Sequence, residues 1–243
     1  VTFMAESAKI LNPDKTVLLP EVKAGCPMAD MADAAAVLEK RNQYAQPFVL
    51  SYVNSTAEVK AVSDLCCTSS NALEMVKSVP AGKDIIFVPD KNLGTYTAAQ
   101  SNRSMHLWPG YCPVHQRITV EELTAEKRVH PDAEIIVHPE CSEEVTKYAD
   151  VVGSTGDMVT HCGKSLKKTF IIGTEVGLVE RLRVLYPEKT FIPASTEAVC
   201  KDMKYTTLES VRLSLKEMRT EIVIKEDVAA KALLPIRKML GLH

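Results

Sequence analysis

The sequence predicts an α/β protein with mostly parallel sheets, made of three related units. Short apolar runs that suit strands alternate with helical patterns along all 243 residues. An internal repeat relates residues 47–73 to residues 133–159. Three cysteines recur at nearly the same spacing as this repeat. These observations favour repeated α/β units over a single eight-stranded α/β barrel, which the chain length alone would allow.

The expected elements alternate in chain order. Apolar runs rich in β-branched residues and bounded by turn signals predict strands at 1–5, 16–19, 47–53, 84–88, 105–108, 133–137, 169–173, 189–193 and 220–224. Amphipathic stretches predict helices at 6–11, 28–41, 56–62, 69–78, 93–101, 119–128, 142–148, 155–161, 175–185, 207–218 and 226–240.

The composition excludes several classes of protein. Hydrophobic residues make up 46% of the chain and charged residues 25%, which is ordinary for a globular protein. Lys and Arg number 29 against 31 Asp and Glu, so the net charge of −2 carries no electrostatic footprint for nucleic acid. No apolar run approaches the roughly 18 residues of a membrane span. We therefore expect a cytoplasmic protein with neither a nucleic acid nor a membrane as partner.

The repeat aligns Tyr52 with His138 and Asn54 with Glu140, each 86 residues apart. Glu6, Asp90 and Glu175 are expected to mark strand ends in the three units.

The expected domains are a partial first domain at 1–27 plus 201–243, a second at 28–112 and a third at 113–200. A counterpart of the half-unit at 47–73, placed 86 residues earlier, would fall before residue 1. We therefore expect that the chain lacks an N-terminal half-unit with a third set of site residues.

Seven cysteines are an odd number in a long chain, which argues against a disulfide framework. Cys26, Cys112 and Cys200 lie 86 and 88 residues apart, at the same place in each unit. Three thiolates that meet on one axis suit an iron–sulfur cluster with one iron free of protein ligands. Such an iron acts as a Lewis acid in dehydration. The alternative is three core thiols. We expect the other four cysteines to pack in the interior: Cys66, Cys67, Cys141 and Cys162.

Polar side chains at two strand ends are candidates for chemistry. His138 and Glu140 follow an apolar strand, and Pro139 turns the chain outward, so both side chains can face a pocket as general acid and base. Tyr52 and Asn54 occupy the same place in the preceding unit and offer a phenol and an amide. The alternative is a surface turn with ordinary polar residues.

Two strand-to-helix junctions offer hydroxyl groups beside free backbone N–H groups, which suits an anion such as phosphate. These are the segments 68–71, with Ser69, and 154–156, with Ser154 and Thr155. Simple N-capping of the helices is the alternative. His115, three residues after Cys112, is a candidate neighbour of the cluster or the substrate.

The chain resembles the quinolinate synthase family over essentially its whole length. The strings that carry the resemblance are FMAESAKILNPDKTVLLPEVKAGC, YVNSTAEVKA, TSSNA, PDKNLG, GYCPVHQ, HPEC, STGDM and RLRVLYPEKTFIPA. The resemblance implies three quasi-equivalent three-layer αβα domains around a pseudo-threefold axis. It also implies a [4Fe–4S] cluster on Cys26, Cys112 and Cys200, as the residue pattern suggests.

The resemblance further implies condensation of iminoaspartate with dihydroxyacetone phosphate, with loss of phosphate and two waters, to give quinolinate for NAD biosynthesis. A second enzyme, an oxidase or a dehydrogenase, would supply iminoaspartate. The resemblance also implies which residues bind substrate. Glu140 is the preferred general acid/base, and Tyr52 is a candidate proton donor. His138 and Asn54 hold carboxylate and carbonyl groups of the substrate. The full set is Tyr52, Val53, Asn54, Ser69, His138, Pro139, Glu140, Ser154 and Thr155.

Family members begin with a further stretch of residues that lines the same pocket, so we expect this chain to have low activity. Two other functions would use the same residue pattern. An iron–sulfur hydro-lyase would act on a hydroxy acid with the same open iron and acid/base pair. An iron–sulfur redox or oxygen sensor would need neither His138 nor Glu140.

Overall fold

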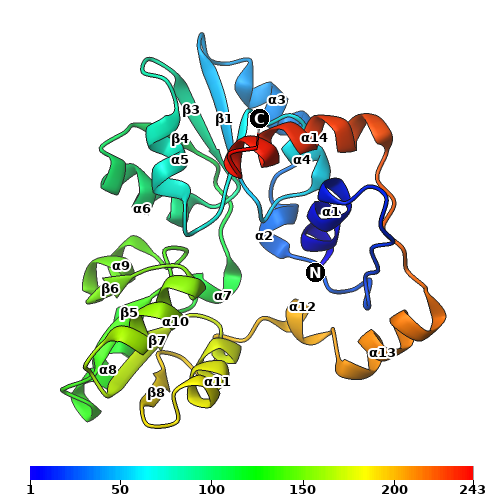
Figure 1. Ribbon diagram of the computed structural model, residues 1–243. Helices are drawn as coiled ribbons and strands as arrows, with labels where there is room; N and C mark the ends of the chain where they lie inside the picture. The colour runs from blue at the N-terminus through cyan, green and yellow to red at the C-terminus, as the bar shows by residue number, and fades with distance from the viewer. Residues whose placement is uncertain (243) are drawn as a thin grey trace. The chain divides into compact units, whose positions relative to one another are not determined.

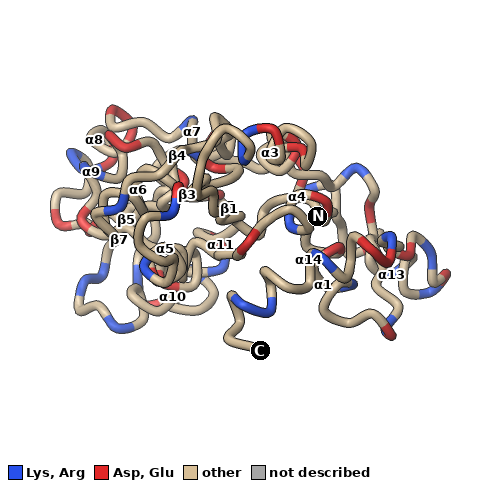
Figure 2. The backbone as a smooth tube through the Cα atoms, turned by 90° about the horizontal axis from the view of Figure 1, so that it is seen from above, with Lys and Arg blue, Asp and Glu red and all other residues tan. Residues whose placement is uncertain are grey.

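The computed structural model describes residues 1–242, which form two compact units. Unit 1 comprises residues 1–110 and the segment from Lys201 onward, and unit 2 comprises Tyr111–Cys200. Lys and Arg are interspersed with Asp and Glu along the chain of both units (Figure 2). Within the described residues, no helix is long and apolar enough to cross a membrane.

Each unit is built on a four-stranded parallel sheet (Figure 1). The strand orders are β2-β1-β3-β4 and β6-β5-β7-β8. The α/β class with parallel sheets is therefore confirmed. The elements of unit 1 are α1 (Thr2–Leu11), α2 (Pro27–Asp30), α3 (Ala34–Arg41), β1 (Pro47–Tyr52), α4 (Ala57–Ala61), β2 (Leu65–Cys67), α5 (Ala72–Ser78), β3 (Asp84–Val88), α6 (Lys91–Ser101), β4 (Met105–Leu107), α12 (Lys201–Lys204), α13 (Leu208–Glu217) and α14 (Glu226–Met239). Those of unit 2 are α7 (Pro113–Gln116), α8 (Val120–Val129), β5 (Glu134–Val137), α9 (Glu143–Tyr148), β6 (Val151–Val152), α10 (Thr155–Lys164), β7 (Thr169–Gly173), α11 (Val176–Leu185) and β8 (Thr190–Pro193).

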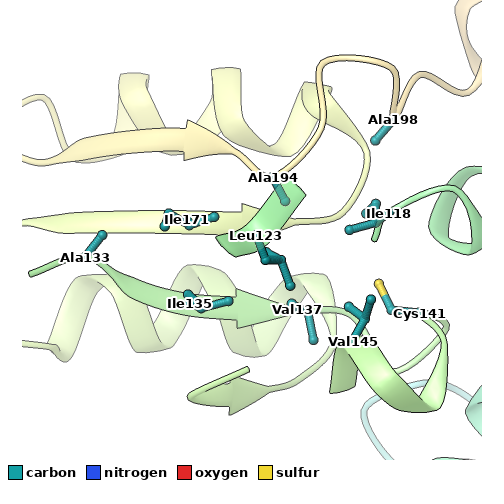
Figure 3. Packing of buried hydrophobic residues seen from close by; sticks show 10 residues of the cluster. All are labelled: Ile118, Leu123, Ala133, Ile135, Val137, Cys141, Val145, Ile171, Ala194 and Ala198. Atoms are coloured by element: carbon teal, nitrogen blue, oxygen red, sulfur yellow. The ribbon is translucent and has the colours of Figure 1, made fainter. Parts of the chain in front are cut away.

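Unit 2 has three layers because its strands bury apolar side chains on both faces. On one face, Ile135 and Val137 of β5 pack with Leu123 of α8 and Val145 of α9 (Figure 3). On the other face, Ile136 of β5 packs in a second cluster with residues of α10 and α11. Consecutive residues of β5 thus point to opposite faces, and both faces are covered by helices.

The two sheets share one register under the 86-residue offset. Leu50 pairs with Leu65 in unit 1, and Ile136 pairs with Val151 in unit 2. In both units, an aspartate accepts a hydrogen bond from a backbone N–H of the corresponding strand. Asp64 Oδ2 accepts the Val49 N–H at 2.8 Å, and Asp150 Oδ2 accepts the Ile135 N–H at 2.8 Å. The division of unit 1 into a partial and a second domain, and the pseudo-threefold axis, stay predictions.

Several expected elements differ from the structure. Residues 2–5 belong to helix α1 and not to a strand, and Val1 is the N-cap of this helix. A five-residue apolar run is too short to distinguish the two periods. The segments 16–19 and 220–224 meet only in an isolated antiparallel bridge, and the expected helix 28–41 is two helices, α2 and α3. The sequence patterns also missed strands β2 and β6.

Candidate functional site

The carboxyl end of β5 carries the polar residues that the sequence singled out. β5 lies between β6 and β7, so the next strand in the chain, β6, is on one side of β5 and the strand after it, β7, is on the other. In parallel α/β sheets, ligands bind at such a topological switch point. The His138 N–H donates to the Gly173 carbonyl at 3.0 Å. A side chain at Gly173 would approach Val137 Cγ1 to 2.7 Å, so this strand spacing requires glycine.

Four predicted or suspected residues come together there. Sγ of Cys112, a ring nitrogen of His115 and a carboxylate oxygen of Glu140 all lie within 4.8 Å of one another. His115 Nδ1 lies 2.9 Å from Glu140 Oε2, without the alignment of a hydrogen bond. The rings of His115 and His138 stack with centroids 4.6 Å apart. One thiol, two imidazoles and one carboxylate therefore share a largely buried site.

His138 is a neutral donor in this site. Burial lowers the pKa of His138 to about 4, and the attraction of Glu140 offsets only part of this effect. The Glu140 N–H donates to His138 Nδ1 at 3.3 Å, so Nδ1 is an acceptor. A neutral imidazole then carries its proton on Nε2. His138 can therefore offer an N–H group to a substrate oxygen but no positive charge.

Thr174 belongs to the same site, and the sequence analysis missed it. Its hydroxyl lies 2.8 Å from His115 Nε2, and both residues are buried. Thr174 directly follows β7, as His138 directly follows β5. The rule that polar residues at carboxyl strand ends face the ligand site would have found it.

The seven cysteines separate by exposure into the two expected groups. Cys66, Cys67, Cys141 and Cys162 are buried, whereas Cys26, Cys112 and Cys200 are partly exposed. Burial raises the pKa of Cys66 to about 12 and that of Cys162 to about 11, so neither thiol ionises at neutral pH. Cys66 and Cys67 lie in strand β2.

A common local structure surrounds the three partly exposed cysteines. Each immediately precedes a four-residue helix, respectively α2, α7 and α12. In all three places, the N–H of the first residue of a longer helix (α1, α6 or α11) donates to the carbonyl of the residue two positions before the cysteine. These hydrogen bonds join Thr2 to Ala24 (2.9 Å), Lys91 to Gly110 (2.8 Å) and Val176 to Ala198 (3.0 Å). The threefold repeat of the cysteines is thus present in the backbone hydrogen bonds.

Glu6 is not the counterpart of Asp90 and Glu175, contrary to the sequence alignment. Asp90 and Glu175 stand at the N-caps of α6 and α11, where each accepts backbone N–H groups. Val1 occupies the corresponding N-cap of α1, and Glu6 lies inside that helix. Glu175 also accepts the Cys200 N–H at 3.3 Å and so links that cysteine to α11.

The remaining candidates lie in unit 1. Tyr52 ends β1 and is buried, and the N–H of Val53 donates to the Cys67 carbonyl at 2.9 Å. Asn54 follows in the turn before α4. Ser69 lies in a turn ahead of α5, which begins at Ala72, so this serine is not at the helix start as expected. The N-cap is Asn71, whose side-chain oxygen accepts the Thr68 N–H.

Ser154 caps α10, which is the alternative considered for this position. Its hydroxyl donates to Asp157 Oδ2 at 2.6 Å and accepts the Asp157 N–H at 3.2 Å. The Ser154 N–H also donates to Asp157 Oδ2, at 2.9 Å. An anion that approaches this helix start, beside Thr155, therefore meets a carboxylate that is already bound there.

Comparisons with known proteins agree with the resemblance. Residues 1–241 match the family model described as Quinolinate synthetase A protein. Quinolinate synthase of Dehalococcoides mccartyi is 48% identical over 240 residues, which cover 99% of this chain and 79% of that protein. Quinolinate synthase of Thermodesulfovibrio yellowstonii is 49% identical over 243 residues, which cover 100% of this chain and 80% of that protein. The match covers nearly the whole chain at almost half identity, so the chain belongs to the quinolinate synthetase A family of enzymes.

Proposed function

We propose that this chain condenses iminoaspartate with dihydroxyacetone phosphate and releases phosphate and two waters to give quinolinate. The atoms balance without an added oxidant or reductant. The observation that carries the proposal is the largely buried group of Cys112, His115, His138 and Glu140 at the switch point of the unit 2 sheet, in a member of this family.

Glu140 is the general acid/base of the proposed reaction. The condensation must remove a proton from carbon, and each dehydration must add a proton to a departing hydroxyl group. Glu140 is buried beside His115, where a carboxylate can take and return such a proton. Tyr52 is the proposed second proton donor.

Substrate oxygens would be held by neutral donors. His138 offers its Nε2–H and Asn54 its amide to carboxylate and carbonyl groups, while Val53 and Pro139 supply backbone in the two turns. Ser69, Ser154 and Thr155 are the proposed anion binders. Asp157 must then give up its hydrogen bonds to Ser154 when a phosphate binds there.

The donor set fits a [4Fe–4S] cluster held by Cys26, Cys112 and Cys200. These thiols are the three with exposed surface and share one local structure. Three thiolates leave one iron of such a cluster without a protein ligand. When bound, the cluster would supply a Lewis acid for a substrate oxygen.

The proposal is tested by iron and sulfide analysis under anaerobic conditions, together with an assay of quinolinate formation. We expect Cys26→Ala, Cys112→Ala and Cys200→Ala each to abolish the cluster and the product. Cys66→Ala and Cys162→Ala should keep the cluster. Glu140→Gln should keep the cluster and lose the product. A cluster that survives the three ligand changes, or an active Glu140→Gln variant, would refute the proposal.

A further inference from the structure

Lys60 of helix α4 is completely buried, although a lysine is rarely found without solvent contact. Its ammonium group donates to the Ser55 carbonyl and lies 5.7 Å from the centre of the Phe3 ring. Glu6 on α1 attracts the ammonium group and accepts the Ala57 N–H at 2.9 Å. A buried cation costs free energy, so its presence calls for an explanation.

Lys60 stands at one end of a chain of polar contacts that leads to Tyr52. The Ser55 hydroxyl donates to the Tyr52 carbonyl at 2.8 Å and lies 2.9 Å from the Ser51 hydroxyl. Both serines are completely buried. Lys60 therefore closes the turn that begins at Tyr52 and contains Asn54.

The fold does not require this arrangement, because unit 2 connects the corresponding strand and helix without a buried lysine. At the 86-residue offset, Val137, Cys141 and Thr146 stand in place of Ser51, Ser55 and Lys60. Val137 and Cys141 pack in the apolar core of unit 2 (Figure 3). Thr146 donates to the carbonyl of Glu143 within its own helix. The turn after β5 is held by this packing and by the Cys141 N–H, which donates to the His138 carbonyl at 3.0 Å, without a buried lysine.

We propose that Lys60 is a positioning residue, which acts through Ser55 to hold Tyr52 and Asn54 in the geometry that binds substrate. The inference rests on the proposed function, because it takes these two residues as substrate ligands. Lys60 itself has no solvent-exposed surface, so the proposed role involves no direct contact with substrate.

The first test is hydrogen exchange of the backbone amides at residues 53–57 in Lys60→Met and in Lys147→Met. The control makes the same side-chain change on the exposed face of α9. We expect faster exchange in this segment for Lys60→Met alone. Equal exchange in the two variants would overturn the inference.

The second test measures substrate KM and kcat in the reconstituted enzyme. Lys60→Met should raise a substrate KM by about tenfold, and Lys147→Met should not. In an Asn54→Ala background, Lys60→Met should raise KM by a smaller factor, because the contribution of Asn54 to substrate binding is already lost. A merely structural role would lower the amount of folded enzyme and leave KM unchanged, which would overturn the inference.

Two further variants keep the test decisive if Lys60→Met does not fold. Lys60→Gln replaces the ammonium group with an uncharged amide on a shorter side chain, and Ser55→Ala removes the hydroxyl while it keeps Lys60. Both should raise KM, and unchanged KM values in both would overturn the inference. Absence of product from the unchanged enzyme would instead refute the proposed function.

Discussion

Replacing Lys60 with Met should change how the stability of the protein depends on pH. Burial lowers the pKa of Lys60 from 10.5 to about 8, although Cys66, Glu6 and Glu58 each raise it. At pH values between about 8 and 10.5, Lys60 is mostly protonated in the unfolded chain and mostly deprotonated in the folded chain. The free energy of unfolding therefore rises with pH in this window.

The magnitude follows from the two pKa values. The difference between 10.5 and about 8 corresponds to about 3 kcal/mol of unfavourable free energy when Lys60 is charged in the folded state. Lys60 is fully buried, so solvent does not screen this cost. About 1 kcal/mol of this unfavourable free energy is lost between roughly pH 7 and pH 9, because Lys60 releases its proton in the folded state. The Met variant has no such recovery.

The assay is urea unfolding of both proteins, under reducing conditions, at several pH values in that range. The stability of Lys60→Met relative to the unchanged protein should fall by about 1 kcal/mol as pH rises across it. The neighbouring groups are present in both proteins, so their own titrations largely cancel in the difference. Lys147→Met should show no such trend. A pH-independent difference for Lys60→Met would refute the reasoning.

Three other predictions concern carboxylates. Glu175→Gln weakens the link between α11 and Cys200, so reconstituted protein should hold less iron and lose it faster to a chelator. Asp64→Ala and Asp150→Ala should each lower the free energy of unfolding by about 1–3 kcal/mol, because each leaves a strand N–H without its acceptor. Asp157→Asn removes a negative charge from the start of α10, so inorganic phosphate should become a several-fold stronger inhibitor.

Surface carboxylates provide the controls. Glu188→Gln should leave the iron content unchanged, and Asp132→Ala should leave the stability within about 0.5 kcal/mol. Glu144→Gln makes the same charge change as Asp157→Asn at another exposed site and should not alter phosphate inhibition. An equal effect in a control and its partner would show that net charge, and not the local contact, is responsible.

Much of the fold could be predicted because its signals are local. Buried strands such as β1, β3, β5 and β7 read as apolar runs, and a parallel sheet buries both of their faces. β2 and β6 were missed because they have only three and two residues, too few for a period to show. Helix α1 was misassigned for the related reason that five apolar residues fit both periods.

The candidate site was predictable where the repeat supplied a second copy. His138 and Glu140 were found from their place at a strand end and from their counterparts 86 residues earlier. Thr174 belongs to no repeated motif and was missed, although it follows a strand end as His138 does; its 2.8 Å contact with His115 assigns it to the site. The roles of these residues in the reaction stay predictions.

The sequence by itself determined the α/β class, the 86-residue register and the separation of the cysteines into three and four, because periodicity and spacing are properties of the chain. The tertiary structure alone decided that Lys60 is buried and that Glu175 reaches the backbone of Cys200. Burial and hydrogen-bond partners depend on segments far apart in the chain. Glu6 and Ala57, for example, are 51 residues apart in the sequence yet joined by one hydrogen bond.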